Sequence, residues 1–367
     1  MMAADPLSFS VDQLLERMVA ARGSDLHLSA GSRPSIRVYG SLMELESAPR
    51  LDGEMIQNGI YLILTQAQRE RFEENYELDL AYSVKGVGRF RMNVFRQRSS
   101  VAAVFRVIPY EIPRLDTLGL PAVVASFAEI PKGLVLVTGP TGSGKSTTLA
   151  SIVDVINRNQ RRHIVTIEDP IEFLHSHQRS VVNQREVGGD TKGFAIALRQ
   201  VLRQDPDVIM VGEMRDYETI AAAITAAETG HLVFATLHTQ DAPQAVDRII
   251  DVFPSHQQVQ IRVQLASSLQ AVMTQQLLPR ADHPGRVAAV EVLVATPAVR
   301  NIIRESKTHQ LYSTMQSGSQ YGMQTMDSHL QALVKQGQIN RDTALLASSN
   351  PRELYEAIQG GKVVRNV

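Results

Sequence analysis

The chain has 367 residues, of which 44% are hydrophobic, enough to build the cores of two domains. It carries 37 basic and 38 acidic side chains, so a nucleic acid or an anionic membrane would have to meet a local basic patch. The absence of cysteine excludes disulfide bonds and thiolate metal sites. The start MMAADPLSFSVDQ lacks the features of a secretory signal, and no run of about 18 apolar residues follows, so we expect a cytoplasmic protein.

The first hundred residues mix helical and strand patterns. Apolar residues recur at helical spacing from Val11 to Val19, and Gly23 follows as a stop signal. Later patterns predict two short strands, a helix and a strand pair, over residues 24–31, 35–42, 54–75 and 88–108. This mixture predicts a small α+β domain over residues 1–112.

A connector and then a different pattern come next. The stretch PYEIPRLDTLGLP holds three prolines and little periodicity, and we expect a linker at residues 113–121. Four apolar runs then alternate with helical segments: GLVLVTG, HIVTIEDP, DVIMVGE and HLVFATLH. Such repetition predicts an α/β domain over residues 122–295, with a mainly parallel sheet covered on both faces. Residues 296–367 are expected to be helical, with two or three helices after AVRNIIRES.

The sequence GPTGSGKST has the spacing GxxxxGK[ST] of a phosphate-binding loop. It follows the apolar run GLVLV and precedes the helical segment STTLASIVDVINR, the setting that this motif requires. In such a loop backbone amides surround the phosphates, Lys145 reaches the β and γ phosphates, and the Ser146 hydroxyl binds Mg²⁺. The predicted nucleotide contacts are Gly139, Pro140, Thr141, Gly142, Ser143, Gly144, Lys145, Ser146 and Thr147. ATP and Mg²⁺ are therefore the expected substrate and cofactor.

Acidic residues end two of the other apolar runs. Glu213 follows DVIMVG, and we expect it to hold Mg²⁺ directly or through water; an exposed glutamate after a core strand is the alternative. HIVTIEDPIEF supplies Glu168, Asp169 and Glu172 at a strand end, where ligands bind in such sheets. Glu172 is predicted to orient the attacking water, and a plain acidic loop is the alternative.

Two histidines bracket the apolar run in AETGHLVFATLHTQ. These histidines are not expected to bind a metal, because cysteine is absent and the nearby chemistry is that of phosphate. His238, close to where Glu172 and Glu213 are presented, is predicted to be a phosphate or interface sensor. His231 is predicted to contact the nucleotide or, alternatively, to tie its strand to the neighbouring strand.

Together these motifs resemble the secretion ATPase superfamily, and within it the PilT-like type IV pilus retraction ATPases. The matching segments are the Walker A loop at 139–147, the acidic box at 166–173, the Walker B motif at 211–216 and the histidine box at 229–239. AVRNIIRE, residues 298–305, resembles the C-terminal motif associated with pilus retraction, usually AIRNLIRE. The resemblance covers nearly the whole chain. It implies a RecA-like P-loop ATPase domain with a smaller N-terminal PAS-like domain and a helical C-terminal tail.

The resemblance also implies a function and partners. We expect a homo-hexamer that hydrolyses ATP to power pilus retraction, and so twitching motility, by removing pilin from the pilus base. It would dock at the inner membrane on a platform protein, with the stretch Arg300 to Glu305 as the expected contact. The missing tetracysteine element argues against pilus extension and type II secretion ATPases. An accessory PilU-like retraction ATPase has nearly the same core, and a related retraction ATPase is a further expected partner.

The segment from Val84 to Ile108 is basic and contains no acidic residue. Its basic members are Lys85, Arg89, Arg91, Arg96, Arg98 and Arg106. Related secretion ATPases imply that Arg91 and Arg106 neutralise charge on the γ-phosphate, whereas a solvated strand face is the alternative. A nucleic-acid translocase is a rival function, but tryptophan is absent and aromatic residues are 5%, so no nucleic-acid partner is expected. A non-catalytic nucleotide sensor is a second rival, which the complete set of catalytic residue types disfavours.

Overall fold

The computed structural model describes residues 10–109 and 111–359 and divides into two units. The first unit comprises residues 1–111 and 170–174, and the second comprises 112–169 and 175–367. The main division thus falls beside the predicted end of the N-terminal domain at residue 112. Residues 1–9, which the sequence predicts to lack a secretory signal, and residues 360–367 of the predicted helical tail lie outside the described residues.

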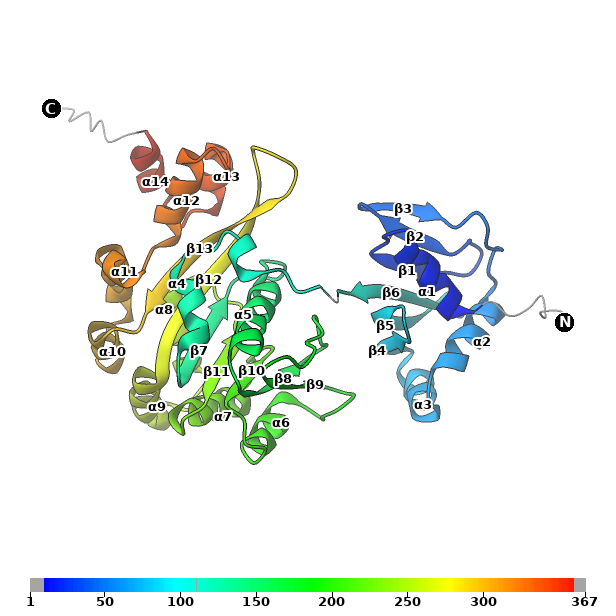
Figure 1. Cartoon of the computed structure of the whole chain (residues 1–367), viewed down its shortest axis with the longest axis horizontal. Helices are drawn as coiled ribbons and strands as arrows, with labels where there is room; N and C mark the ends of the chain where they lie inside the picture. The colour runs from blue at the N-terminus through cyan, green and yellow to red at the C-terminus, as the bar shows by residue number, and fades with distance from the viewer. Residues whose placement is uncertain (1–9, 110, 360–367) are drawn as a thin grey trace. The chain divides into compact units, whose positions relative to one another are not determined.

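The first unit is an antiparallel sheet with helices (Figure 1). Its elements are α1 Val11–Ala20, β1 Asp25–Leu28, β2 Ser35–Val38, β3 Ser41–Glu44, α2 Gly53–Ile63, α3 Gln66–Asn75, β4 Glu77–Val84, β5 Gly88–Gln97 and β6 Ser100–Ile108. The strand order is β3-β2-β1-β6-β5-β4. The expected α+β architecture is confirmed. The predicted helix over residues 54–75 is two helices, because Thr65 forms a capping box with Gln68 and starts α3 anew.

The second unit is built on a seven-stranded sheet of order β13-β12-β7-β11-β10-β8-β9. The strands are β7 Gly133–Thr138, β8 His163–Glu168, β9 Val181–Glu186, β10 Val208–Val211, β11 Leu232–Thr236, β12 Leu269–Pro279 and β13 Arg286–Val294. All neighbours run parallel except β12 and β13, which are antiparallel. The four predicted apolar runs are β7, β8, β10 and β11. The mainly parallel α/β sheet is therefore confirmed, with three strands that the sequence did not predict.

Helices cover both faces of this sheet. They are η1 Leu115–Thr117, α4 Val123–Ser126, η2 Phe127–Glu129, α5 Lys145–Asn159, α6 Phe194–Val201, α7 Tyr217–Glu228, α8 Ala242–Asp251 and α9 Ser255–Ser268. On β7, Leu134 and Leu136 belong to the cluster that includes α6 to α9, whereas Val135 and Val137 belong to the cluster with α4 and α5. The stretch 113–121, expected to be a linker, lies with this unit, because its leucines pack on the second of these clusters.

The chain continues in a helical region, drawn in orange to red in Figure 1. Its helices are α10 Pro297–Arg304, η3 Thr308–Gln310, α11 Leu311–Ser317, η4 Ser319–Tyr321, α12 Met326–Lys335, α13 Arg341–Ala347 and α14 Pro351–Ile358. In the described part of this region four α-helices follow α10, more than the two or three predicted. Leu330 and Leu333 of α12 pack with Leu278 and Val287 at the ends of β12 and β13. Among the described residues, no helix has both the length and the apolarity needed to cross a bilayer.

Glu291 of β13 joins this helical region to the sheet domain. The residue is 2% exposed, and its carboxylate accepts hydrogen bonds from the amide of Ala242, 2.8 Å away, and that of Met326, 3.4 Å away. These amides begin α8 and α12, where a negative charge is favoured. Burial outweighs these hydrogen bonds and raises the pKa of Glu291 to about 7.

Glu291 is expected to make stability depend on pH. Because its folded pKa of about 7 lies above the ordinary value of 4.5, the folded protein binds more protons than the unfolded chain between these values. The free energy of unfolding should therefore fall as pH rises from 4.5 through 7, by about 3 kcal/mol in total from this group. Glu291→Gln, which does not titrate, should remove this component in urea unfolding at pH 5 and pH 8. An unchanged difference between the two pH values would contradict the assignment.

Candidate nucleotide-binding site

The phosphate loop between β7 and α5 depends on glycine for its shape. Gly139, Gly142 and Gly144 have φ values of 133°, 78° and 90°, in the region that favours glycine. A Cβ on Gly139 would lie 2.2 Å from the backbone oxygen of Gln275, and one on Gly144 would lie 2.7 Å from its Nε2. Gln275 of β12 is buried and accepts a hydrogen bond from Thr148 of α5 over 2.8 Å. The loop is therefore packed directly on β12.

Lys145, the first residue of α5, is held inside the loop. Its Nζ donates hydrogen bonds to the backbone oxygens of Gly139, 2.8 Å away, and Pro140, 3.0 Å away, and the residue is 8% exposed. Ser146 follows in the first turn, where the unpaired amides and the helix dipole favour anions. A buried ammonium at the start of a helix whose amides face a glycine loop is suited to bind phosphate groups.

Glu213 and His238 lie together at the same edge of the sheet. Strands β7, β11 and β10 are parallel neighbours, so the segments that follow them leave the sheet at one edge. Glu213 Oε2 lies 3.5 Å from His238 Nε2, and Glu213 Oε1 lies 2.8 Å from Arg215 Nε. The expected proximity of His238 to Glu213 is thus present in the structure.

The oxygen atoms at this edge suit a magnesium ion. Mg²⁺ prefers oxygen ligands and keeps several waters while binding one or two carboxylates and substrate phosphates. The Ser146 hydroxyl follows β7, and the 21%-exposed carboxylate of Glu213 follows β10 at the same edge. The prediction that these two residues hold the ion therefore stays a prediction.

The three carboxylates of the acidic box differ in their surroundings. Glu168 is 6% exposed and accepts hydrogen bonds from Thr166 Oγ1 over 2.6 Å and from Gln184 Nε2 over 3.2 Å, so it stabilises the end of β8. Asp169 and Glu172 are exposed. Glu172 lies between β8 and β9 in the stretch 170–174, which is counted with the first unit. It remains the candidate for orienting water.

His231 does not fit the expectation of nucleotide contact within one subunit. It precedes β11, and its Nδ1 lies 2.9 Å from the backbone oxygen of Ala226 in α7. Its own backbone oxygen accepts a hydrogen bond from the amide of Gly133, at the start of β7. The phosphate loop begins at the other end of β7, about 20 Å away at about 3.3 Å per residue. His231 instead ties β11 to α7 and β7, the structural alternative given above.

The two candidate arginines lie side by side in the first unit. Arg91 on β5 is paired in register with Arg106 on β6, so both side chains leave the same face of the sheet. Arg106 Nε donates to Asp25 Oδ1 over 2.7 Å, and Arg91 Nε lies 3.9 Å from Asp79 Oδ1. Burial would raise the pKa of Asp25, but hydrogen bonds from Ser24 and Arg106 hold it below its usual value. Each of the two arginines thus has a carboxylate beside it on this face, an arrangement poorly suited to a nucleic-acid backbone.

Comparisons with known proteins show the family of the chain. A family model described as Type II/IV secretion system protein matches residues 3–359. The chain belongs to this family. It is 50% identical to the type IV pilus retraction ATPase PilT of Pseudomonas aeruginosa over 334 residues, 91% of this chain and 96% of that protein. It is 43% identical to the type IV pilus ATPase PilU of the same organism, over 95% of this chain and 91% of that protein.

A solved relative shares the fold as well as the sequence. The crystal structure of the pilus retraction motor PilT with bound ADP matches with a TM-score of 0.89 and 49% identity, over 95% of this chain and 99% of that chain. The predicted resemblance to PilT-like retraction ATPases is therefore confirmed. The match also supports the predicted architecture of a RecA-like ATPase domain with a smaller N-terminal domain and a helical tail.

The segment AVRNIIRE, residues 298–305, forms most of helix α10 and its C-cap. Within this helix the side chain of Arg300 contacts the end of α9. Its Nη1 lies 2.7 Å from the backbone oxygens of both Ala266 and Ser267, and its Nη2 lies 3.2 Å from Gln270 Oε1. These carbonyls end α9, where a positive charge is favoured. Arg300, which the sequence predicts to be part of a partner contact, thus caps the end of α9 within this chain. Asn301, Arg304 and Glu305 remain exposed.

Arg300→Ala is expected to lower the free energy of unfolding by about 1–3 kcal/mol, because the α9 carbonyls lose a charged donor. Arg304→Ala provides the matched control, since Arg304 is an exposed arginine on the same helix and should cost at most about 0.5 kcal/mol. Urea unfolding of the two variants measures both values. Equal losses would show that Arg300 does not cap α9.

Proposed function

We propose that this chain is the ATP-hydrolysing motor of type IV pilus retraction. The observation that carries the proposal is the phosphate loop with Lys145 held inside it, at the same sheet edge as the paired Glu213 and His238. The 50% identity to PilT over 91% of this chain supports retraction as the work that hydrolysis drives. PilU is also a relative, but the identity is lower at 43%, so the principal motor is favoured over an accessory one.

Each group at the site has a proposed task in hydrolysis. The loop amides and the start of α5 bind the phosphates, and Lys145 moves from the loop carbonyls to the β and γ phosphates. Ser146 and Glu213 would hold Mg²⁺, which would offset negative charge on the phosphates. Glu172 orients the attacking water, and His238 responds to the γ-phosphate through Glu213.

The assembly and the location are also part of the proposal. Six copies form a ring, in which Arg91 and Arg106 of the first unit neutralise charge on the γ-phosphate; their side chains are 50% and 70% exposed. The ring works on the cytoplasmic side of the inner membrane, at the base of the pilus. The exposed residues Asn301, Arg304 and Glu305 of α10 are the proposed contact with a membrane platform protein.

Deletion of the gene tests the proposed function. Cells without it are expected to keep surface pili and to lose retraction and twitching, because pilin is no longer removed. Purified protein should release phosphate from ATP and should stop when EDTA removes Mg²⁺. Loss of the pili themselves would indicate pilus extension, and normal twitching in the deletion strain would indicate an accessory motor.

A further inference from the structure

Gln275 of β12 is a buried amide that lies against the phosphate loop and α5. The residue is 3% exposed, although glutamine is mostly found at the surface and a buried carboxamide needs hydrogen-bond partners. Its side chain meets residues of the loop and of the first turn of α5, far from it in the sequence. A polar side chain in this place therefore has a task other than apolar packing.

The side chain of Gln275 contacts both ends of the turn that begins α5. Its Oε1 accepts a hydrogen bond from the hydroxyl of Thr148 over 2.8 Å, and Thr148 is 1% exposed. Its Nε2 lies against Gly144, where an added Cβ would be 2.7 Å from it. The amide of Thr148 donates to the oxygen of Gly144 over 3.0 Å, which closes this turn around Lys145. Gln275 thus spans the turn whose first helical residue is Lys145.

The backbone of Gln275 supports the other end of the loop. Its carbonyl oxygen occupies the place where a side chain on Gly139 would project. One residue earlier, Thr274 Oγ1 lies 2.8 Å from the Oγ1 of Thr138, the last residue of β7, and both residues are 0% exposed. Gln275 therefore contacts the first glycine of the loop through its backbone and the last glycine through its side chain.

Strand β12 gives Gln275 a fixed position. The strand is paired with β7 along one edge and with β13 along the other. Val290 of β13, which is in register with Gln275, is itself held by the helical region: its amide donates to His329 Nδ1 over 2.9 Å, and its oxygen accepts from Gln324 Nε2 over 2.7 Å. A side chain on a strand that is held from both sides is a rigid support for the loop.

We propose that Gln275 is a positioning residue for the phosphate loop, which holds Gly144 and the first turn of α5 in the shape that binds the phosphates of a nucleotide. The inference rests on the proposed function, because it assumes that this loop binds ATP. Gln275 acts through the loop amides and Lys145 and not by contact with the nucleotide. Such donors must be held within about 0.5 Å of the productive geometry by the side chains around them.

The test is a double-mutant cycle between Gln275→Met and Thr148→Val. Methionine keeps the length of glutamine and valine the shape of threonine, but each change removes the polar groups of their bond. Each single variant is expected to bind ADP about tenfold more weakly in calorimetric titrations of the full chain. The double variant should lose little more, because the two side chains act through one contact. Thr148→Ser, which keeps the hydroxyl, should bind ADP with nearly the wild-type Kd.

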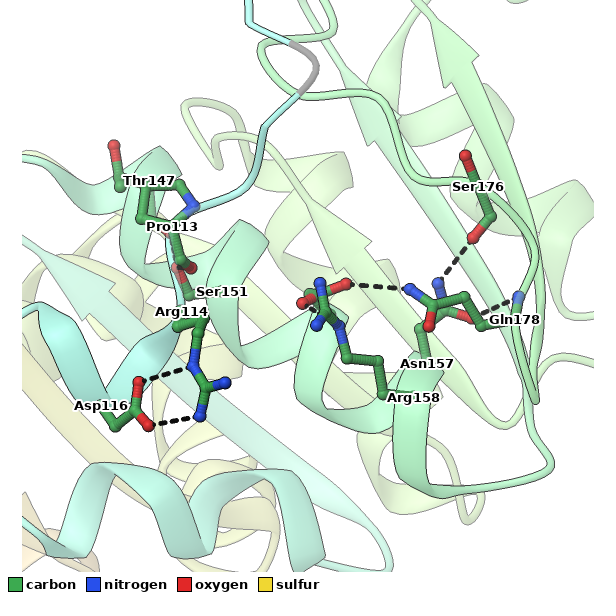
Figure 2. Close-up of polar contacts among 10 residues, drawn as sticks. Pro113, Arg114, Asp116, Thr147, Ser151, Asn157, Arg158, Ser176 and Gln178 are labelled. Carbon is green, nitrogen blue, oxygen red and sulfur yellow. Dashed lines mark hydrogen bonds and ion pairs between the residues drawn. The ribbon is translucent and has the colours of Figure 1, made fainter.

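Ser151→Ala is the matched control on the same helix. Ser151 is 0% exposed, and its hydroxyl donates to the backbone oxygens of Thr147 over 2.8 Å and Pro113 over 2.7 Å; Figure 2 shows it beside Pro113. The change removes a buried hydroxyl from α5 without altering a contact of Gln275. It should therefore lower the temperature of thermal unfolding, as Gln275→Met does, while the Kd of ADP stays within about twofold of the wild type.

Three results would overturn the positioning role. They are a wild-type Kd in Gln275→Met, an equal loss of affinity in Ser151→Ala, and losses at Gln275 and Thr148 that simply add. A wild-type protein that binds no ADP would overturn the proposed nucleotide site itself, and this role with it.

A second variant covers the case in which Gln275→Met does not fold. Gln275→Asn keeps an amide that is one methylene shorter, and it repeats the titration if thermal unfolding shows that Gln275→Met is unfolded. It should again bind ADP about tenfold more weakly, because the shorter side chain cannot span the turn. If neither variant folds, Gln275 serves the fold alone and the proposal is overturned.

Discussion

Lys145→Ala is expected to abolish ATP turnover, lowering the rate of phosphate release by at least about 10²- to 10³-fold. The ammonium is at the start of α5 and is held by two carbonyls of the phosphate loop, from which it can reach the β and γ phosphates. No other side chain of the segment 139–147 carries a positive charge. The variant should also bind a fluorescent ATP analogue more weakly, because phosphate binding loses its charged donor.

Lys132→Ala is the matched control for this experiment. Lys132 is an exposed lysine just before β7, at the edge of the sheet opposite the phosphate loop. Its loss should leave both turnover and nucleotide affinity within about twofold of the wild type, as for most surface changes. Near-normal phosphate release by Lys145→Ala would refute the assignment of the phosphate loop as the site of ATP hydrolysis.

Glu172→Gln is expected to bind ATP normally and to hydrolyse it about 10²- to 10⁴-fold more slowly. Glutamine keeps the size of the side chain but cannot accept a proton from water. The position is exposed, so the change should not disturb the core. Binding and single-turnover phosphate release, measured on the same preparation, separate the two steps.

Glu129→Gln controls for the loss of an exposed carboxylate at another position. Glu129 is exposed in η2, just ahead of β7, and its change should leave kcat unaltered. If Glu172→Gln weakened ATP binding and left the hydrolysis rate of bound ATP unchanged, Glu172 would be a nucleotide-binding residue. Water would then be oriented by another group, with Asp169 the nearest exposed carboxylate in the acidic box.

The parts of the site that could be predicted are those whose chemistry is local in sequence. A glycine-rich loop between an apolar strand and a helix fixes its own backbone, so Lys145 and Ser146 could be placed before any contact was known. Parallel strands end at a common edge of the sheet, so the proximity of His238 and Glu213 could also be predicted. The same rule placed His231 at the opposite edge once β7 and β11 proved to be parallel neighbours.

The parts that could not be predicted depend on pairings between distant segments. Strand β9 has a polar sequence, VVNQRE, and its place at the sheet edge comes from pairing with β8 alone. The floor of the phosphate loop is Gln275 of β12, which no local pattern connects with Gly139. The contact of Arg300 could not be predicted, because its partners are backbone carbonyls at the end of α9, which any residue type can supply.

The hydrogen bonds that Glu291 accepts from the first amides of α8 and α12 limit which segments can be exchanged between this chain and a relative. A chimera that takes only the C-terminal helices from a relative would pair a foreign Met326 amide with the host carboxylate of Glu291. A joint placed just before β13 would instead separate Glu291 from α8 and Arg300 from α9. The smallest segment that carries all these partners begins at α8, so a chimera that keeps these contacts exchanges α8, α9, β12, β13 and the helical tail together.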